Sequence, residues 1–321
     1  MSIKKLRFVA AAAHTETRLD AALAGWLPAA LGRPVSKAKV RKLIMAGAVL
    51  VNERRTRLAS MALKAGVTVE AHVDPVKLFE DLTSRDKTFE LTPDRILFED
   101  DDLIVVDKPP GLPSQPTLDE TRDHLLAAVT RFVEKRGGHK PYIGVHHRLD
   151  RDTSGVVLFT KSRRVNEAVA DAFSQRKVVK IYQALTVEGS SKREWSVRNY
   201  IGKVSSKAKR AKYGAVQSDG ELAETSFRLI EKHPHGNWIE AVPKTGRTHQ
   251  IRVHLAECGL PILGDDLYGT EETGRLMLHA GELRFPHPVS GLEISVKSPL
   301  PGDFKQRLHR IRMNDLDKRE P

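Results

Sequence analysis

Apolar residues recur at intervals of three and four near the start of the chain, as in Leu19, Leu23, Trp26 and Leu27. This spacing predicts an amphipathic helix, and a second stretch with the same spacing follows a serine that can cap it. Short apolar runs then predict two strands. The elements expected in this part are helices over 18–31 and 37–46 and strands over 48–52 and 67–69.

Short uninterrupted apolar runs are typical of the chain after residue 94. The elements expected here are strands over 96–98, 103–106 and 156–159 and a helix over 123–134. Lys108-Pro109-Pro110-Gly111 directly follows the second of these strands and cannot continue it, because proline lacks a backbone donor. Residues 75–93 are charged and weakly periodic. The pattern therefore predicts two modules joined by a linker.

Composition and charge narrow the class of protein. The 321 residues are 40% hydrophobic and 29% charged, which fits a globular protein and excludes disordered, collagen-like and disulfide-stapled classes. Residues 1–80 hold 14 Lys and Arg against six Asp and Glu, so they carry +8 of the net charge of +12. This excess favours a polyanionic partner, either nucleic acid or an anionic membrane surface. No apolar run approaches the ~18–20 residues that a membrane span needs.

The single cysteine, Cys258, allows no internal disulfide and no cysteine-rich zinc site. A reducing cytoplasm is the simplest compartment for such a chain. His249 and His254 are five residues apart and lack the HExxH pattern, so we expect hydrogen-bonding roles for them rather than a metal site.

The segment with the clearest chemical content is His146 to Gly155. Asp150 lies there at a loop-to-strand junction, flanked by His147, Arg148 and Arg151. In such an electropositive setting a carboxylate stays ionised and can act as a nucleophile or a base. Asp152 is two residues further on and would point the opposite way in an extended chain, so the two carboxylates cannot form a catalytic pair. We expect Asp152 to stabilise a turn.

His147-Arg148-Leu149-Asp150 followed by Thr153-Ser154-Gly155-Val156 resembles the signature of the RluA-type pseudouridine synthases. Further segments agree with that family in order and spacing, namely 107–112, 180–182, 246–254, 259–269, 278–280 and 285–288. The resemblance implies an α+β fold with a mixed, largely antiparallel central sheet and flanking helices. It also implies isomerisation of uridine to pseudouridine within RNA, without a metal or an organic cofactor.

The same resemblance implies roles for individual residues. Asp150 matches the family's catalytic aspartate, and Arg252 matches the arginine that holds it ionised, with Arg247 as the alternative. Tyr182 matches the tyrosine that stacks on the base and takes part in the final proton removal. Arg148 is expected to fill the gap that the flipped uridine leaves. His147 and Arg247 are further candidates for contact with RNA, as is Lys108, which either lies near the pocket or closes a turn.

The N-terminal module resembles the alpha-L RNA-binding motif in Arg18-Leu19-Asp20, in Ser36 before a basic helix, and in 44–52. Glu53 stands where that family usually has glycine, a departure that bears on the turn at this point. The cations of the helix would face phosphates and have little means of reading bases; they are Lys37, Lys39, Arg41 and Lys42. The domains expected are a tail over 1–16, the alpha-L domain over 17–74, a linker over 75–93, the catalytic domain over 94–300 and a tail over 301–321.

These expectations combine into a cytoplasmic RNA pseudouridine synthase that needs no membrane and no oligomer. Large-subunit ribosomal RNA is the first expected substrate and transfer RNA the second. A non-catalytic RNA-binding or ribosome-assembly factor is the alternative of another class. A hydrolytic glycosidase normally needs two cooperating carboxylates, and this sequence offers one convincing acid.

Overall fold

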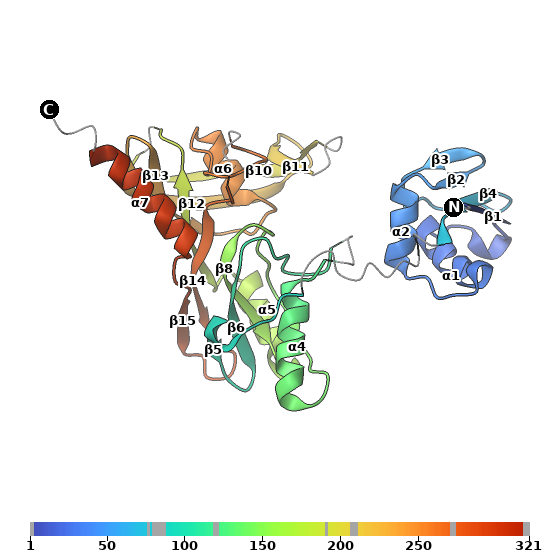
Figure 1. The fold of residues 1–321 in the computed structure, drawn as a ribbon, viewed down its shortest axis with the longest axis horizontal. Coiled ribbons are helices and arrows are strands. Elements are labelled where there is room, and N and C mark those ends of the chain that lie inside the picture. Colours follow the sequence, from blue (N-terminus) through green and yellow to red (C-terminus); the bar gives the residue numbers. More distant parts are fainter. Residues whose placement is uncertain are drawn as a thin grey trace. The chain divides into compact units, whose positions relative to one another are not determined.

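A computed structural model of the chain describes residues 3–75, 78, 88–117, 122–189, 192–205, 211–269 and 274–316. The chain divides into two compact units with a boundary near residue 88, and each has its own hydrophobic core (Figure 1). The helices of the described residues include none long and apolar enough to cross a membrane.

The N-terminal unit packs two helices against a small antiparallel sheet. Its elements are β1 (Lys4–Val9), α1 (Leu19–Leu31), α2 (Lys37–Met45), β2 (Val49–Val51), β3 (Arg54–Thr56) and β4 (Thr68–Val73), with a 3-10 turn at Ala12–His14. The strand order is β1-β4-β2-β3. Leu19, Leu23 and Leu27 of α1 are fully buried, as their spacing predicts. The Ser36 side chain accepts a hydrogen bond from the backbone N–H of Lys39, so the expected cap is present.

The first residues of the chain belong to this sheet, so the expectation of a tail over 1–16 is wrong. β1 pairs with β4 over its whole length, from Lys4 opposite Val73 to Val9 opposite Thr68. Leu6 and Phe8 pack against the core while their neighbours point outward. This alternation is the period of a half-buried strand, but it covers too few residues to be recognised without its partner.

The turn between β2 and β3 keeps a conformation that suits glycine although glycine is absent. Asn52 and Glu53 both have positive φ angles, of 46° and 66°. Two such residues form the tight turn whose twist matches a hairpin, and Val51 pairs with Arg54 directly across it. Glu53 therefore adopts the left-handed conformation that a glycine would adopt at lower cost.

The second unit, which contains the expected catalytic domain and is called the catalytic unit below, is built on one large sheet. Its strands are β5 (Ile96–Glu99), β6 (Leu103–Lys108), β7 (Gly144–Val145), β8 (Ser154–Thr160), β9 (Val179–Thr186), β10 (Glu194–Ser205), β11 (Lys212–Ala215), β12 (Glu221–His233), β13 (Gly236–Pro243), β14 (Leu278–Pro286) and β15 (Glu293–Lys297). The main path runs β11-β10-β12-β13-β9-β14-β8-β6-β5, with β15 paired to β14 and β7 to β8. The pairing of β14 with β8 is parallel and the other pairings are antiparallel. The expected mixed, largely antiparallel sheet is confirmed.

The parallel pair depends on a glycine that follows the Asp150 loop. Gly155 lies opposite Ala280 with a φ of 117°, and a Cβ atom added there would lie 2.1 Å from the carbonyl oxygen of Ala280. A side chain at this position would push β8 and β14 apart. Because β8 begins at Ser154, this close approach helps to fix where the loop before it emerges from the sheet.

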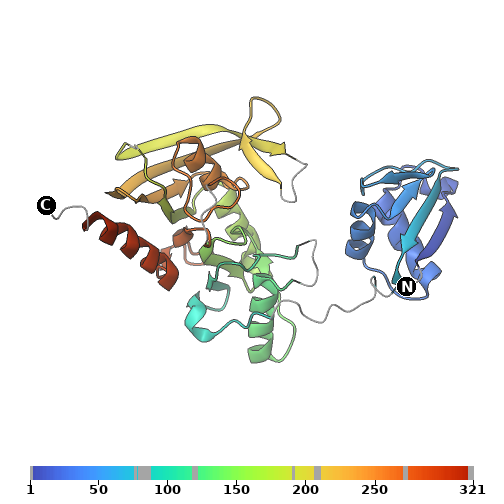
Figure 2. The same ribbon diagram turned by 45° about the horizontal axis from the view of Figure 1, so that its top comes forward.

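Four helices of the described residues flank the sheet: α4 (Leu125–Gly137), α5 (Asn166–Ser174), α6 (Gln250–Glu257) and α7 (Gly302–Leu316). They cover three clusters of buried apolar residues, one with α4, one with α5 and one with α6 and α7. Figure 2 shows α6 lying over the long strands β10 to β13, and its contacts are with β11, β12 and β13. This position places α6 on the half of the sheet from β11 to β13, next to the central strand β9.

Two expected boundaries differ from those of the catalytic unit. Phe89 and Leu91 pack in its core, and the Phe89 backbone N–H donates to Asp123, so residues 88–93 belong to this unit and not to the linker. The rest of the expected linker lies largely outside the described residues. The expected tail over 301–321 is also wrong for 302–316. Phe304, Leu308 and Ile311 in α7 are buried, and their spacing of four and three residues is that of a core-facing helix.

Candidate active site

A pocket of about 360 Å³ opens where the loop before β8, strand β9 and the loop before α6 meet. Charged and aromatic side chains from these segments line it, among them Arg148, Asp150, Lys180, Tyr182, Arg247, His249 and Arg252. The structure therefore brings together Asp150, Tyr182 and Arg252, which are far apart in the sequence. The side chain of Asp150 is 20% exposed and lines the pocket.

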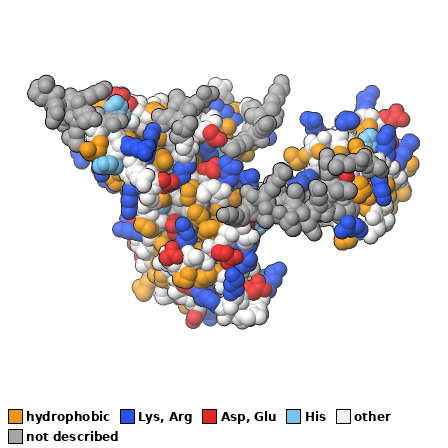
Figure 3. All heavy atoms as spheres, viewed as in Figure 1, with side chains coloured by type: hydrophobic (Ala, Val, Ile, Leu, Met, Phe, Trp, Pro, Cys, Tyr) orange, Lys and Arg blue, Asp and Glu red, His pale blue; other side chains and the backbone are white. Residues whose placement is uncertain are grey.

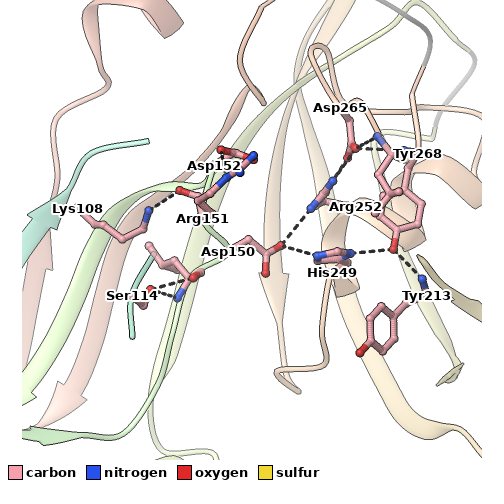
Figure 4. A network of polar contacts seen from close by, with 12 residues as sticks. Lys108, Ser114, Asp150, Arg151, Asp152, Tyr213, His249, Arg252, Asp265 and Tyr268 are labelled. Carbon is pink, nitrogen blue, oxygen red and sulfur yellow. Dashed lines mark hydrogen bonds and ion pairs between the residues drawn. The ribbon is translucent and has the colours of Figure 1, made fainter. Parts of the chain in front are cut away.

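Arg252 joins two carboxylates in this site. Its Nη1 atom lies 3.5 Å from Oδ2 of Asp150, and its Nε and Nη2 atoms donate to Asp265 at 2.8 and 2.7 Å (Figure 4). The Asp265 side chain is completely buried. Burial lowers the pKa of Arg252, but the hydrogen bonds and charge of Asp265 and the charge of Asp150 raise it overall. The guanidinium therefore stays positive and is held by a planar two-point contact while its remaining edge faces Asp150.

Arg247 does not take part in this ion pair. Its Nη1 donates to Glu221 at 2.6 Å and its Nε to the carbonyl oxygen of Leu222 at 3.1 Å. Between the two arginines considered from the sequence, the structure thus selects Arg252 as the partner of Asp150. Arg247 still lines the pocket.

The electropositive setting of Asp150 has a different origin from the expected one. His147 accepts a hydrogen bond from the Leu158 backbone N–H at 2.9 Å and stacks on Phe173, and burial lowers its pKa to about 3. Its ring is therefore neutral. Arg151 forms a two-point ion pair with Asp152, which confirms the structural role expected for that aspartate. The positive charge nearest Asp150 comes from Arg252.

Lys108 closes a turn, so the expectation that it contacts RNA is wrong for this conformation. Its side chain is completely buried, and its ammonium group donates to the backbone carbonyl groups of Pro109, Leu112 and Arg151. Burial lowers its pKa to about 7. Of the two alternatives that the sequence left open for Lys108, the structure therefore supports the closing of a turn.

The loop that carries Asp150 is anchored on both sides. The Ser114 hydroxyl donates to the carbonyl oxygen of Leu149 and accepts from its backbone N–H, while Lys108 holds the carbonyl oxygen of Arg151 (Figure 4). Asp150 lies between these two anchored residues. Such fixed backbone geometry is what a preorganised catalytic carboxylate needs.

Comparisons with known proteins identify the family to which the fold and the sequence motifs point. Residues 102–257, which include Asp150, Tyr182 and Arg252, match the family described as RNA pseudouridylate synthase. A ribosomal large subunit pseudouridine synthase D from Neisseria meningitidis is 30% identical over 92% of this chain and 79% of its own length. A ribosomal large subunit pseudouridine synthase C from Vibrio vulnificus is 32% identical over 87% of this chain and 90% of its own.

This chain belongs to the RluA family of RNA pseudouridine synthases. A solved structure entitled human RNA pseudouridylate synthase domain containing 4 covers 68% of the chain and 92% of its own length, with 27% identity and a TM-score of 0.57. The chain is therefore an RNA-modifying isomerase with the pseudouridine synthase fold. Its substrate is RNA.

Tyr182 of this pseudouridine synthase is a half-buried, neutral phenol. Burial, and then the charge of Asp150, raise its pKa above the usual range. Tyr182 lines the pocket from β9 and packs against two of the apolar clusters, so its ring is held from behind. A protonated phenol suits stacking on a base better than it suits removal of a proton.

Sequence reasoning missed four residues of the site: Lys180, His249, Asp265 and Tyr268. Lys180 precedes Tyr182 by two positions on β9, and alternate positions of a strand share a face. This spacing could have placed it in the pocket. Its ammonium has no hydrogen-bond or ion-pair partner among the described residues, and burial lowers its pKa.

His254 is the hydrogen-bonding residue that the sequence suggested. Its Nδ1 pairs with the Thr225 hydroxyl and its Nε2 with the Asn199 side chain, both at 2.9 Å. It is completely buried beneath α6. His249, by contrast, lies in the pocket.

The basic helix of the N-terminal unit is α2, as expected. Asp20 is completely buried and accepts ion-pair contacts from Arg41 at 2.8 Å and Arg18 at 3.1 Å. The hydrogen bond from Arg18, followed by that from Arg41, lowers the pKa of Asp20 to about 2. Arg41 therefore fastens α2 to α1, although 41% of its side chain is exposed. Lys37 is exposed, whereas Lys39 and Lys42 are half-buried.

Proposed function

We propose that this enzyme isomerises specific uridines of large-subunit ribosomal RNA to pseudouridine, with Asp150 as its catalytic carboxylate. The observation that carries the proposal is the ion pair between Asp150 and Arg252 in a pocket that also contains Tyr182. The names of the two bacterial relatives favour ribosomal RNA over transfer RNA as the substrate. The cytoplasm is the compartment proposed for this reaction.

The reaction requires the same few steps whatever the RNA. The bond between N1 of uracil and C1′ of ribose breaks, the base turns, and a bond forms between C5 and C1′. C5 then loses its proton and N1 gains one, so no atom is added or removed overall. The first step needs an ionised carboxylate at the sugar, either to attack C1′ or to remove a ribose proton. Asp150 is the proposed carboxylate, whether it attacks C1′ or removes the ribose proton.

The neighbours of Asp150 fit supporting roles. Arg252 orients the carboxylate, because its guanidinium lies 3.5 Å away and is itself fixed by Asp265. Tyr182 offers a half-buried ring at the pocket wall, on which a flipped uracil can stack. Arg148 is exposed at the mouth of the pocket, where a side chain could replace the flipped nucleotide in the RNA helix.

The N-terminal unit is proposed as an RNA-binding domain of the alpha-L type over residues 17–74, to whose sheet the preceding strand β1 adds. Lys and Arg side chains are spread over the face of this unit that Figure 3 shows. Contacts between such cations and phosphates release counterions and give affinity without sequence selection. Selection of the uridine would then rest with the catalytic pocket.

Release of tritium from C5 of uridine tests the proposed chemistry. The substrate is ribosomal RNA transcribed with [5-³H]uridine, and transfer RNA labelled in the same way is compared with it. Asp150→Asn is expected to abolish release and to leave RNA binding unchanged. Asp171→Asn, which alters an exposed carboxylate of α5, is the control and is expected to release tritium normally.

Three results would contradict the proposal. Wild-type turnover by the Asp150→Asn variant would remove its catalytic role. Free uracil among the products would indicate a hydrolase instead of an isomerase. An absence of release from every RNA by the wild-type protein would favour the non-catalytic RNA-binding factor.

A further inference from the structure

His249 lies between the catalytic carboxylate and a tyrosine of the loop that follows α6. Its Nε2 atom is 3.9 Å from Oδ2 of Asp150, and its Nδ1 atom is 2.9 Å from the hydroxyl of Tyr268 (Figure 4). The backbone of His249 has a φ of 58°, which is uncommon for residues other than glycine and asparagine. Its side chain makes no capping bond to α6, although it occupies the cap position. The ring is therefore directed into the pocket and away from the helix.

The hydrogen bonds of Tyr268 determine which ring nitrogen of His249 carries the hydrogen. The Tyr268 oxygen accepts a hydrogen bond from the backbone N–H of Tyr213 at 3.0 Å. Burial raises the pKa of Tyr268 to about 12, so the phenol keeps its own proton. The hydroxyl can donate that proton to Nδ1 of His249, which lies 2.9 Å away, and we assign this direction to the bond. Nδ1 is then an acceptor, and in a neutral ring the hydrogen must lie on Nε2.

The His249 ring is neutral at the pH of the cell. Burial lowers its pKa, as do the charges of Arg252 and Arg148, against the opposing effect of Asp150 and Asp265. Tyr213 and Tyr268 both pack their rings edge-on against the imidazole. The Nε2–H group of a neutral, tightly packed imidazole therefore points at Asp150.

We propose that His249 is a positioning residue that donates its Nε2–H to Asp150 in the RNA-bound enzyme, and that Tyr268 holds it in the required tautomer. The inference rests on the proposed catalytic role of Asp150. The distance of 3.9 Å is too long for a hydrogen bond in the free protein. Hydrogen bonds of catalytic groups are often long before substrate binds and shorten in the complex.

Arg252 and His249 both approach the same carboxylate oxygen of Asp150. Arg252 approaches Oδ2 at 3.5 Å and His249 approaches it at 3.9 Å. Neither of these contacts involves Oδ1, which leaves that oxygen to face the ribose. Two donors on one oxygen would fix the rotation of the carboxyl group, which one donor alone cannot do.

Two substitutions of His249 separate the donor from the rest of the ring. In His249→Asn the amide lies where Nδ1 was, so it can reach Tyr268 but not Asp150. In His249→Gln the longer side chain brings an amide N–H close to the position of Nε2. Asparagine is also the side chain that best tolerates the left-handed conformation, so this variant is expected to fold.

The expected result is a loss of kcat without a loss of RNA binding. His249→Asn and Tyr268→Phe should each lower kcat for tritium release by about 10- to 100-fold, the range for one hydrogen bond to a charged group. KM for the RNA should stay within about twofold of the wild-type value. His249→Gln should recover a large part of the lost kcat. Tyr200→Phe, which alters a tyrosine exposed on β10, is the control and should behave as wild type.

Other outcomes would overturn the inference. Wild-type kcat in His249→Asn or in Tyr268→Phe would show that no donor acts on Asp150 from this side. Equal losses in the Asn and Gln variants, or a rise in KM alone, would assign His249 a packing or RNA-binding role. If His249→Asn fails to fold, Tyr268→Phe decides the question. An active Asp150→Asn enzyme would instead refute the proposed function itself.

Discussion

Replacement of Asp265 by asparagine should damage both the stability and the activity of the catalytic unit. Asp265 accepts four hydrogen bonds, from Nε and Nη2 of Arg252 and from the backbone N–H groups of Leu267 and Tyr268. Asparagine has one acceptor oxygen, so its amide nitrogen must face at least one of these donors. The buried guanidinium of Arg252 would also lose its closest negative partner.

The size of the effect follows from this burial. The Asp265 side chain is completely buried and that of Arg252 is 8% exposed, so water cannot replace the lost contacts. Removing one partner of a buried ion pair costs about 3–5 kcal/mol. For a unit of this size such a loss lowers the melting temperature by roughly 10 °C. A shift of Arg252 by about 1 Å would lower kcat by about 100-fold, because the carboxylate it orients would be misplaced.

Calorimetry and tritium release measure the two effects on the same preparation. Asp266→Asn is the matched control, since it removes the same charge from the adjacent, exposed residue. That variant should stay within about 0.5 kcal/mol of wild type. If the Asp265→Asn variant has the same melting temperature and the same kcat as the Asp266→Asn control, Asp265 does not hold Arg252 in place.

Three further predictions concern ionisable groups that are buried or half-buried. Lys180→Met removes an ammonium group that has no polar partner in the described part of the chain. Loss of this desolvated charge should raise the melting temperature measured by calorimetry. Loss of a hydrogen-bond donor from the pocket should lower kcat/KM by about tenfold or more. Burial lowers the pKa of His254 to about 4. The catalytic unit should therefore lose stability as the pH falls from about 6.5 to 4. His254→Gln should flatten that part of a plot of melting temperature against pH. Asp20, with its pKa lowered to about 2 mainly by Arg18, should stabilise the N-terminal unit above about pH 4 and lose this effect between pH 4 and 2. Asp20→Asn should therefore be less stable than wild type at pH 7 and equally stable at pH 2; a constant difference at both pH values would contradict the assignment.

Much of the fold could be predicted because local pattern and tertiary structure agree. The apolar runs 103–106 and 156–159 are buried strands, and Leu19, Leu23 and Leu27 form the buried face of a helix. The segments taken as tails were missed for a physical reason. β1 has only six residues and is stabilised by pairing with β4, which follows it by about 60 residues in the chain. The apolar positions of α7 do have helical spacing, but they are set among many charged residues.

The residues of the site could likewise be predicted only in part. Asp150, Tyr182 and Arg252 belong to motifs that could be recognised in the sequence, and they do line one pocket. The partner of each cation could not be predicted, because ion pairs such as Arg252 with Asp265 and Arg247 with Glu221 depend on which loops the fold brings together. The neutral state of His147 likewise follows from burial, which the charges next to it in the sequence do not reveal.

The central claim is that Asp150 makes pseudouridine in large-subunit ribosomal RNA, and a map of pseudouridines in cellular RNA tests it most directly. Ribosomal and transfer RNA would be taken from cells without this gene and from the same cells supplied with the wild-type protein or with Asp150→Asn. We predict that at least one pseudouridine of large-subunit ribosomal RNA disappears with the gene, returns with the wild-type protein, and stays absent with the variant. An unchanged ribosomal RNA map, a loss confined to transfer RNA, or restoration by Asp150→Asn would contradict the account.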